Sequence, residues 1–591
     1  MRFKSNTQNG FTVYAVTGVN TVSFAIDFDP AQVHGLLGFG VEREDHSENE
    51  RYFMRGFKVF ESLIPNPTTD IIVSTFEQPI QSFVWDDFTT KEKHEYTYFF
   101  YPFKGSPKNL DRTAAPIAIK VKTEDLFDAT AHHHIFFNRG VMSSQAYKRE
   151  FDNLAPDKLP AGKRQKAFDW LSRDLLKGLK TFLEQANAGD KILGCFYEFH
   201  YKEAVQLFKD ALDRGVDVQL IIDAKVNEYT DKKGKFHESF PREANLRTLL
   251  GPGGVNFPAA RVKLREASPN YIQHNKFAVF VDSNNVAKAV WTGSTNISEG
   301  GIFGHTNVGH WVIDGAIALK YRQYWELLHN DPSGKDFKKA IDALQKDLTA
   351  DEVATIPNGI IPVFSPRTKQ KMLDMYAQLL DDSLDVACIT LAFGINTLFK
   401  SKLLDHNSSS PIVFMLLEKE DKANPEKPDE FVPLKIDQNV YQAFGSYLKD
   451  DLNRWSKETN QGIAGLNGHV IYVHSKFLLS NPLGENPIVI TGSANFSENS
   501  TTLNDENMII IKGDKRTADI YFTEFNRLFN HYYFRSIYNK TIAQNALNSA
   551  ALKESLFLKE DDEWLQKYKV GRLKFKRIQM YRKMAGARIV L

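Results

Sequence analysis

The chain has 591 residues, enough for two to four domains or for one large duplicated unit with appendages. Its formal net charge of +1 excludes a bulk attraction to nucleic acid or membrane, so any such attraction must be local. No run of about 18 apolar residues predicts a transmembrane helix, and the first residues lack the apolar core of a secretory signal. We therefore expect a cytoplasmic protein.

Residues 1–150 show the alternation of apolar and polar side chains that is typical of β-strands. It is clearest at Val22–Phe28, Tyr96–Phe100 and Ile117–Val121, with Gly, Pro, Asn and Asp between the runs. The pattern predicts an N-terminal all-β, sandwich-like domain. We place His132–His134 in a polar loop and predict no metal site, because no cluster of Cys, Asp or Glu stands at ligand spacing.

Helix and strand patterns alternate after a segment with Pro and Gly, residues 151–166, that reads as a linker. An apolar stripe from Phe168 to Phe182 predicts one helix. Strand Ile192–Tyr197, a helix around Ala204–Ala211 and strand Val218–Asp223 then form a βαβ unit, which favours parallel pairing of the two strands.

The same order returns in the second half of the chain. A helix at Met372–Leu379 precedes strands Val386–Leu391 and Ile412–Leu417, and aromatic-rich helices are expected at Ala316–Leu328 and Ala518–Phe529. The sequence therefore predicts an α/β fold of two pseudosymmetric lobes. The predicted segments are the sandwich-like domain 1–150, lobe 1 at 160–350, lobe 2 at 355–540 and a basic extension at 541–591, with irregular rim segments at 224–270 and 419–470. Cys195 and Cys388 lie in apolar runs and are expected to be buried free thiols.

A short motif occurs once in each predicted lobe. The first copy holds His274, Lys276 and Gly293-Ser294-Thr295-Asn296; the second holds His474, Lys476 and Gly492-Ser493-Ala494-Asn495. The His and Lys of each copy point to one face of a strand, because residues i and i+2 do. Two imidazoles that face one phosphate suit a two-step displacement, in which one attacks phosphorus and the other protonates the leaving oxygen.

The two copies resemble the paired His-x-Lys…Gly-Ser-x-Asn signature of the phospholipase D superfamily, over roughly residues 160–540. The resemblance implies two lobes whose motifs line one pocket. It also implies cleavage or transfer of a phosphodiester through a covalent phosphohistidine, without metal or cofactor. The family pattern has an Asp five residues after the Lys, where this chain has Val281 and Asn481. Some members that process DNA ends also lack this Asp.

The resemblance also suggests a role for each site residue. In the family, side chains near the positions of Asn307 and Glu506 contact the histidine of the opposite lobe. We therefore predict that Glu506 holds His274, the nucleophile, and that Asn307 holds His474, the general acid. Lys276, Lys476, Asn296 and Asn495 would bind the non-bridging oxygens, Ser294 and Ser493 would contact substrate, and Asp282, Glu299 and Glu498 are expected at the surface.

The substrate class stays open between a phospholipid, slightly favoured, and a nucleic acid. The two lobes in one chain, the added β-domain and the neutral body favour a lipid, whereas the missing Asp fits a nuclease. A non-catalytic binding module is the third alternative. Residues Trp564–Leu591 hold nine Lys and Arg and no acids. We expect them to form a solvated tail or a helix paired with the acidic run Glu560–Glu563, or a patch that contacts anionic surfaces.

Overall fold

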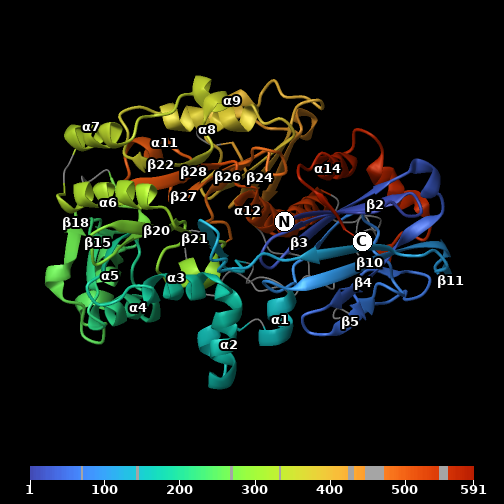
Figure 1. Cartoon of the computed structure of the whole chain (residues 1–591), viewed down its shortest axis with the longest axis horizontal. Coiled ribbons are helices and arrows are strands. Elements are labelled where there is room, and N and C mark those ends of the chain that lie inside the picture. The colour runs from blue at the N-terminus through green and yellow to red at the C-terminus, as the bar shows by residue number, and fades with distance from the viewer. Residues whose placement is uncertain are drawn as a thin grey trace.

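The computed structural model describes residues 1–67, 71–140, 145–152, 154–266, 271–331, 334–423, 431–445, 472–544 and 557–590. Two similar α/β lobes lie beside an N-terminal β-sandwich (Figure 1), so the predicted fold class is confirmed. Across these ranges, no helix combines the length and the apolar character that a membrane span requires.

The first lobe is built on a seven-stranded sheet in the order β13-β21-β20-β19-β14-β15-β18. Strands β14 and β15 pair in parallel, as predicted for the βαβ unit. Their near-continuous apolar sequences are explained by burial on both faces. The strands are β13 (His133–Phe137), β14 (Lys191–Phe196), β15 (Asp217–Asp223), β18 (Val262–Arg265), β19 (Lys276–Val281), β20 (Ala287–Gly293) and β21 (Val308–Val312).

The sheet of the second lobe has seven strands in the order β22-β28-β27-β26-β23-β24-β25. Position by position this order matches the first sheet, and β23 and β24 pair in parallel as β14 and β15 do. The duplication is therefore one of topology as well as of sequence. The strands are β22 (Gly359–Ser365), β23 (Val386–Leu391), β24 (Ile412–Leu417), β25 (Val440–Phe444), β26 (Phe477–Ser480), β27 (Ile488–Gly492) and β28 (Glu506–Lys512).

Two aromatic-rich helices, α6 (Gly315–His329) and α12 (Lys515–Gln544), lie between the two sheets (Figure 1). Each reaches the opposite lobe, since Tyr321 of α6 donates to Asn507 over 2.9 Å and Tyr521 of α12 lies 3.0 Å from the ring of His310. The other helices are α1 (Gln145–Phe151), α2 (Ala161–Ser172), α3 (Leu175–Glu184), α4 (Lys202–Asp213), α5 (Arg242–Leu250), α7 (Gly334–Leu344), α8 (Lys371–Asp381), α9 (Thr397–Lys402), α11 (Glu498–Thr502) and α14 (Leu573–Arg582).

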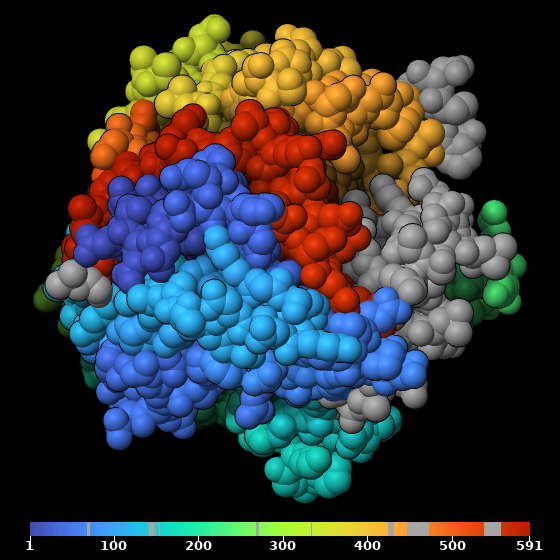
Figure 2. All heavy atoms as spheres, turned by 90° about the vertical axis from the view of Figure 1, so that its right-hand side faces the viewer, coloured from blue at the N-terminus to red at the C-terminus, as the bar shows by residue number. Residues whose placement is uncertain are grey.

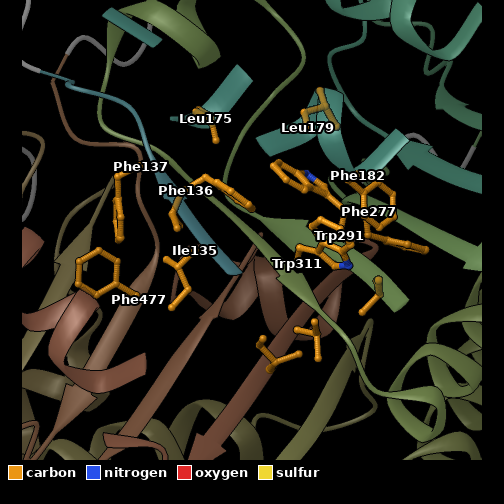
Figure 3. Packing of buried hydrophobic residues seen from close by; sticks show 14 of the residues in the cluster. Ile135, Phe136, Phe137, Leu175, Leu179, Phe182, Phe277, Trp291, Trp311 and Phe477 are labelled. Carbon is orange, nitrogen blue, oxygen red and sulfur yellow. The ribbon is translucent and has the colours of Figure 1, made fainter. Parts of the chain in front are cut away.

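Strand β13 ties the hydrophobic cores of the two lobes together. The ring of Phe136 stacks on Trp291 at 5.5 Å within lobe 1, while Phe137 meets Phe477 of lobe 2 at 6.2 Å (Figure 3). Aromatic pairs at these separations add to the free energy of burial. The two lobes are therefore held by one continuous core.

The sandwich consists of two sheets, β30-β1-β2-β3-β9 and β11-β10-β4-β5, with β12 pairing to β10. Its alternating strands β3, β10 and β12 are those that the sequence predicted. The larger strands are β1 (Arg2–Ser5), β2 (Phe11–Thr17), β3 (Val22–Phe28), β4 (Leu36–Asp45), β5 (Glu50–Phe53), β9 (Val84–Asp87), β10 (Glu95–Ser106), β11 (Asn109–Asp111), β12 (Ile117–Lys122) and β30 (Arg588–Val590); short pairs are formed by β6 (Arg55–Gly56) with β8 (Val73–Ser74) and by β7 (Val59–Phe60) with β29 (Phe557–Leu558).

The C-terminal segment completes this sandwich, so the expectation of a solvated tail is wrong for residues 557–590. Strand β30 pairs in parallel with β1, and Trp564, Tyr568 and Ile578 are buried in the sandwich core. In Figure 2 the C-terminal atoms pack directly against those of the N-terminal domain. Apolar residues between the basic ones explain the docking, because their burial outweighs the tendency of the charges to stay in water.

Three further predictions are wrong. His133 and His134 are buried in β13 of lobe 1 rather than in a polar loop. The single helix predicted from Phe168 is two helices, α2 and α3, because the chain bends at Arg173, whose φ of 46° is left-handed. The first rim segment, 224–270, holds a hairpin, α5 and β18; much of the second, 419–470, lies outside the described residues. The domain boundaries themselves stay predictions. Both cysteines are buried and free, as expected.

Candidate active site

Backbone hydrogen bonds between the lobes position the two motif histidines. The amide of His274 donates to the carbonyl of Asp505 over 2.9 Å, and the amide of His474 donates to the carbonyl of Thr306 over 3.2 Å. Each histidine therefore lies beside a segment of the opposite lobe. The segment beside His274 leads to Glu506, and the segment beside His474 leads to Asn307. The two arrangements are related by the pseudosymmetry of the lobes, so both motifs contribute to one site at the interface.

Acidic side chains at the ends of β15 and β24 fix the residues that precede the histidines. Asp223 accepts from the amide of Gln273 over 2.9 Å, and Glu418 accepts from the amide of Val473 over 2.7 Å. Burial raises the pKa of Asp223 to about 7. The sequence analysis missed both residues, although each ends a parallel strand at the edge where such sheets bind ligands.

His274 and Glu506 form a buried pair across the lobes, with 2.9 Å between Nδ1 and Oε2. Because an ionised carboxylate only accepts, Nδ1 carries the proton and Nε2 presents its lone pair. Burial lowers the pKa of His274 below its ordinary value, although Glu506 opposes this. Burial raises the pKa of Glu506, but the electrostatic interaction and hydrogen bond with His274 outweigh this effect, and the net pKa is lowered.

His474 is held by an amide in place of a carboxylate. Its Nδ1 lies 3.1 Å from Oδ1 of Asn307, while Nδ2 of Asn307 donates to the carbonyl of Gly301 over 2.7 Å and to His305 over 2.8 Å. With both amide protons used, Oδ1 must face His474, so Nε2 of this ring also presents a lone pair. Burial holds the pKa of His474 well below its ordinary value, and the charge of Lys476 lowers it further.

The two lysines make equivalent contacts. Nζ of Lys276 donates to the carbonyl of His274, and Nζ of Lys476 donates to the carbonyl of His474, each over 2.6 Å. Burial lowers the pKa of Lys276 to about 8 and holds that of Lys476 well below its ordinary value, where the charge of Lys276 adds to the effect. The charge of Lys276 acts on Lys476, so the two ammonium groups are close together, as a site for an anion requires.

The motif asparagines leave polar atoms unsatisfied inside the protein. Among the described residues, neither Oδ1 of Asn296 nor Oδ1 of Asn495 has a hydrogen-bond partner, although both atoms are buried. Buried polar groups are nearly always paired, so a ligand or water that completes their bonds is expected here.

The other residues that the sequence singled out either support the strands around the site or lie at the surface. Ser294 and Ser493 are fully buried, and their hydroxyls accept from the amides of Val308 and Asn507, so they brace the strands around the site. Asp282 caps a turn and pairs with Lys288 at 3.2 Å, and Glu299 and Glu498 are exposed, as expected for surface residues.

Three further side chains contribute to the site. The ring of Tyr197 lies 5.0 Å from that of His274, and the ring of His305 lies 4.5 Å from that of His474. Burial lowers the pKa of His305 to about 3, with a further effect from Lys476. Burial raises the pKa of Glu198, but its interactions with His200 and Ser298 outweigh this effect, and the net pKa of the carboxyl is lowered. Tyr197 and Glu198 follow β14, which is the signal that could have indicated them.

A family model described as the PLD-like domain of cardiolipin synthase matches residues 179–328 and 427–529, one stretch in each lobe. Both lobes are therefore similar in sequence to a phospholipase D-like domain. No curated protein is similar enough in sequence to give a significant match.

The solved structures to which this chain is similar include proteins with several different activities. Phosphatidylserine synthase of Haemophilus influenzae is 11% identical, with 66% of this chain and 94% of that chain covered and a TM-score of 0.38. Yeast tyrosyl-DNA phosphodiesterase 1 is 12% identical, with 57% and 85% covered and a TM-score of 0.30. Polyphosphate kinase of Porphyromonas gingivalis is 10% identical, with a TM-score of 0.35; 58% of this chain is covered, and the chain spans 46% of that protein. These weak similarities leave the substrate class open.

Proposed function

We propose that the protein is a phosphodiesterase that cleaves or transfers its substrate through a covalent phosphohistidine. The observation that carries the proposal is the crossed arrangement of the two histidines, each with Nδ1 held by the opposite lobe and Nε2 presenting a lone pair. In this proposal, Nε2 of His274 attacks phosphorus, the bond from phosphorus to the leaving oxygen breaks, and that oxygen takes a proton from Nε2 of His474. Water or an alcohol then gives its proton back to His474 as it displaces His274 from phosphorus.

Charge explains why the two histidines would differ in role. Attack makes His274 cationic, and the buried Glu506 stabilises that cation across a 2.9 Å hydrogen bond. His474 must be protonated before it can act as an acid, while burial and the nearby lysines oppose its protonation. A bound phosphodiester brings a negative charge to the site and raises the pKa of His474. Substrate binding would thus prepare its own general acid.

The remaining motif residues would bind the phosphate. Lys276 and Lys476 would supply charge, and Nδ2 of Asn296 and Nδ2 of Asn495 would donate to the non-bridging oxygens, while their buried Oδ1 atoms remain free to accept from water or a substrate hydroxyl. Ser294 and Ser493, which the sequence suggested as substrate contacts, would instead hold the strands in place.

The test compares the wild-type protein with His274→Ala, using bis(p-nitrophenyl) phosphate as a small phosphodiester. His34→Ala is the matched control, because the side chain of His34 is 96% exposed. We expect the control to keep full activity and His274→Ala to lose turnover while it remains folded. Phospholipid vesicles and DNA, offered separately, then assign the substrate class. Wild-type-like hydrolysis by His274→Ala would refute the assignment, and no hydrolysis of any phosphodiester by the wild type would favour a binding module.

A further inference from the structure

A short β-hairpin leaves the first lobe between β15 and α5. Strands β16 (Tyr229–Thr230) and β17 (Phe236–His237) pair antiparallel, with Tyr229 opposite His237 and Thr230 opposite Phe236. The base is fixed by the side chain of Asn227, which makes hydrogen bonds of 2.8 and 2.9 Å with the backbone of Phe240. The tip is fixed by Asp231, which accepts from two amides of the turn. The hairpin is therefore a built element, and the second lobe shows no equivalent among its described strands.

The hairpin exposes aromatic rings on both of its faces. Tyr229 is 59% exposed and Phe236 is 61% exposed, and Val226 and Phe240 add exposed apolar surface at the base. The rings of Tyr229 and His237 lie parallel, 4.7 Å apart with an angle of 7° between them. Paired strands place neighbours on opposite faces, so Phe236 points away from that stack.

The positive charges at the tip are unpaired. Lys232, Lys233 and Lys235 are exposed, and none of them forms an ion pair with any residue in the described part of the chain. Two of the three acids in the hairpin are already engaged, and the third, Glu228, is exposed beside Tyr229. Asp231 lies 3.1 Å from His237 and bonds the turn amides, and Glu238 pairs with Arg247. The surface therefore complements a polyanion.

The base of the hairpin adjoins the candidate active site. The ring of Phe240 lies 5.8 Å from that of His200, and Nε2 of His200 lies 3.7 Å from the carboxylate of Glu198. Glu198 in turn acts electrostatically on Lys276. At the other end of the hairpin segment, Asp223, the last residue of β15, accepts a hydrogen bond from the amide of Gln273, the residue before His274. A chain bound along the hairpin would run toward the two histidines.

We propose that this hairpin, residues 224–241, binds single-stranded nucleic acid and leads it to the site between the lobes. Exposed rings stack on bases, and unpaired lysines neutralise backbone phosphates. Proteins bind single-stranded nucleic acid through these two kinds of contact. A hairpin that inserts into a membrane would carry its apolar residues at the tip, whereas this one carries lysines there and rings on its stem. The delivery of a strand for cleavage rests on the proposed function, but the binding does not.

The test measures binding by fluorescence anisotropy of a labelled oligothymidylate in the His274→Ala background, which keeps the probe intact. Tyr229→Ala/Phe236→Ala removes the rings, and Lys232→Ala/Lys233→Ala/Lys235→Ala removes the charges. Matched controls are Phe88→Ala, at a ring that is 56% exposed on the sandwich, and Lys108→Ala/Lys122→Ala, at exposed lysines of the same domain. All of these side chains except that of His274 lie at the surface, so the variants are expected to fold.

We expect the ring variant to bind about 10- to 100-fold more weakly than the background protein. The lysine variant should lower the slope of log K against log salt by about 2, since each lost phosphate contact contributes about 0.7. The controls should change neither quantity. With His274 restored, the hairpin variants should hydrolyse bis(p-nitrophenyl) phosphate at the wild-type rate but cleave the oligonucleotide more slowly.

Unchanged oligonucleotide binding in both hairpin variants would overturn the inference. So would a loss of binding to phosphatidylglycerol vesicles with oligonucleotide binding retained, which would make the hairpin a membrane contact. A wild-type protein that binds the oligonucleotide through the hairpin but hydrolyses no phosphodiester would support the inference and refute the proposed function.

Discussion

Replacement of Glu506 by Gln separates the charge of the orienting residue from its shape. Glu506 is fully buried, and its Oε2 lies 2.9 Å from Nδ1 of His274. Glutamine is nearly isosteric, and its carbonyl oxygen can accept the same hydrogen bond. The second half-site already uses an amide in this position, at Asn307. The substitution therefore removes mainly the negative charge that would stabilise His274 as a cation.

The geometry gives the size of the effect. The charge centres of a carboxylate and an imidazolium joined by this bond are about 4 Å apart, and at an effective dielectric constant of about 20 their interaction is worth about 4 kcal/mol. If that interaction is made only after attack, its loss raises the barrier by the same amount, which lowers kcat by about 10³-fold. Substrate affinity should change little, because Glu506 bonds the histidine and not the phosphate.

The assay is the release of p-nitrophenolate from bis(p-nitrophenyl) phosphate in a single turnover, which reports the first chemical step. Acid quenching then measures the phosphohistidine itself. Asn307→Asp is the informative companion, because it places a carboxylate beside His474 and should raise the pKa of that ring. A kcat for Glu506→Gln within tenfold of the wild type would refute the reasoning, and so would a loss that appears only in KM.

Other expectations follow from the same structure. The value of kcat/KM should fall above about pH 8, because the pKa of Lys276 is about 8 and the lysine must stay charged to bind phosphate; a profile that is flat to about pH 10 would contradict this. Activity should be indifferent to EDTA, since imidazole, ammonium and amide groups carry the proposed chemistry, and loss that added metal restores would count against it. Trp564→Ala should lower the free energy of unfolding by about 3–5 kcal/mol, because its ring fills the sandwich core and its Nε1 donates to Leu36. Val570→Ala, at a side chain that is 84% exposed, is the control and should change it by less than about 0.5 kcal/mol; equal effects of the two would refute the docking of the C-terminal segment.

The sequence predicted those parts of the fold in which the local pattern of apolar residues matches the burial of the strand. The apolar runs of β14, β15, β23 and β24 are buried on both faces, so their composition alone indicates parallel strands in a sheet. The repeated spacing of His, Lys and Asn indicated which side chains would share a site. The family resemblance indicated the crossed contacts of Asn307 and Glu506 that the structure contains.

The errors come from contacts between distant parts of the chain. Nothing near His133 or His134 reveals that their strand pairs with β21, about 175 residues further on. The basic C-terminal residues conceal Trp564 and Tyr568, whose rings fill the core of a domain that begins at residue 1. Tyr197, Glu198 and His305 have no repeated counterpart in the sequence, so the comparison of the two motif copies could not indicate them.

The structure limits how the two lobes can have diverged. Each histidine ring is held by a side chain of the other lobe, so neither lobe contains a complete half-site, and the interface must persist for chemistry to occur. The symmetry breaks at the orienting residues and at the residues two positions before them. Glu506 receives a bond from Asn504, whereas Asn307 donates one to His305. Because the backbones match while these four side chains differ, the proposed division of labour between nucleophile and acid would be set by the charge next to each ring. An exchange of the two orienting side chains should then exchange the roles of the two histidines, and the phosphorylated residue in the quenched enzyme would identify which ring attacks.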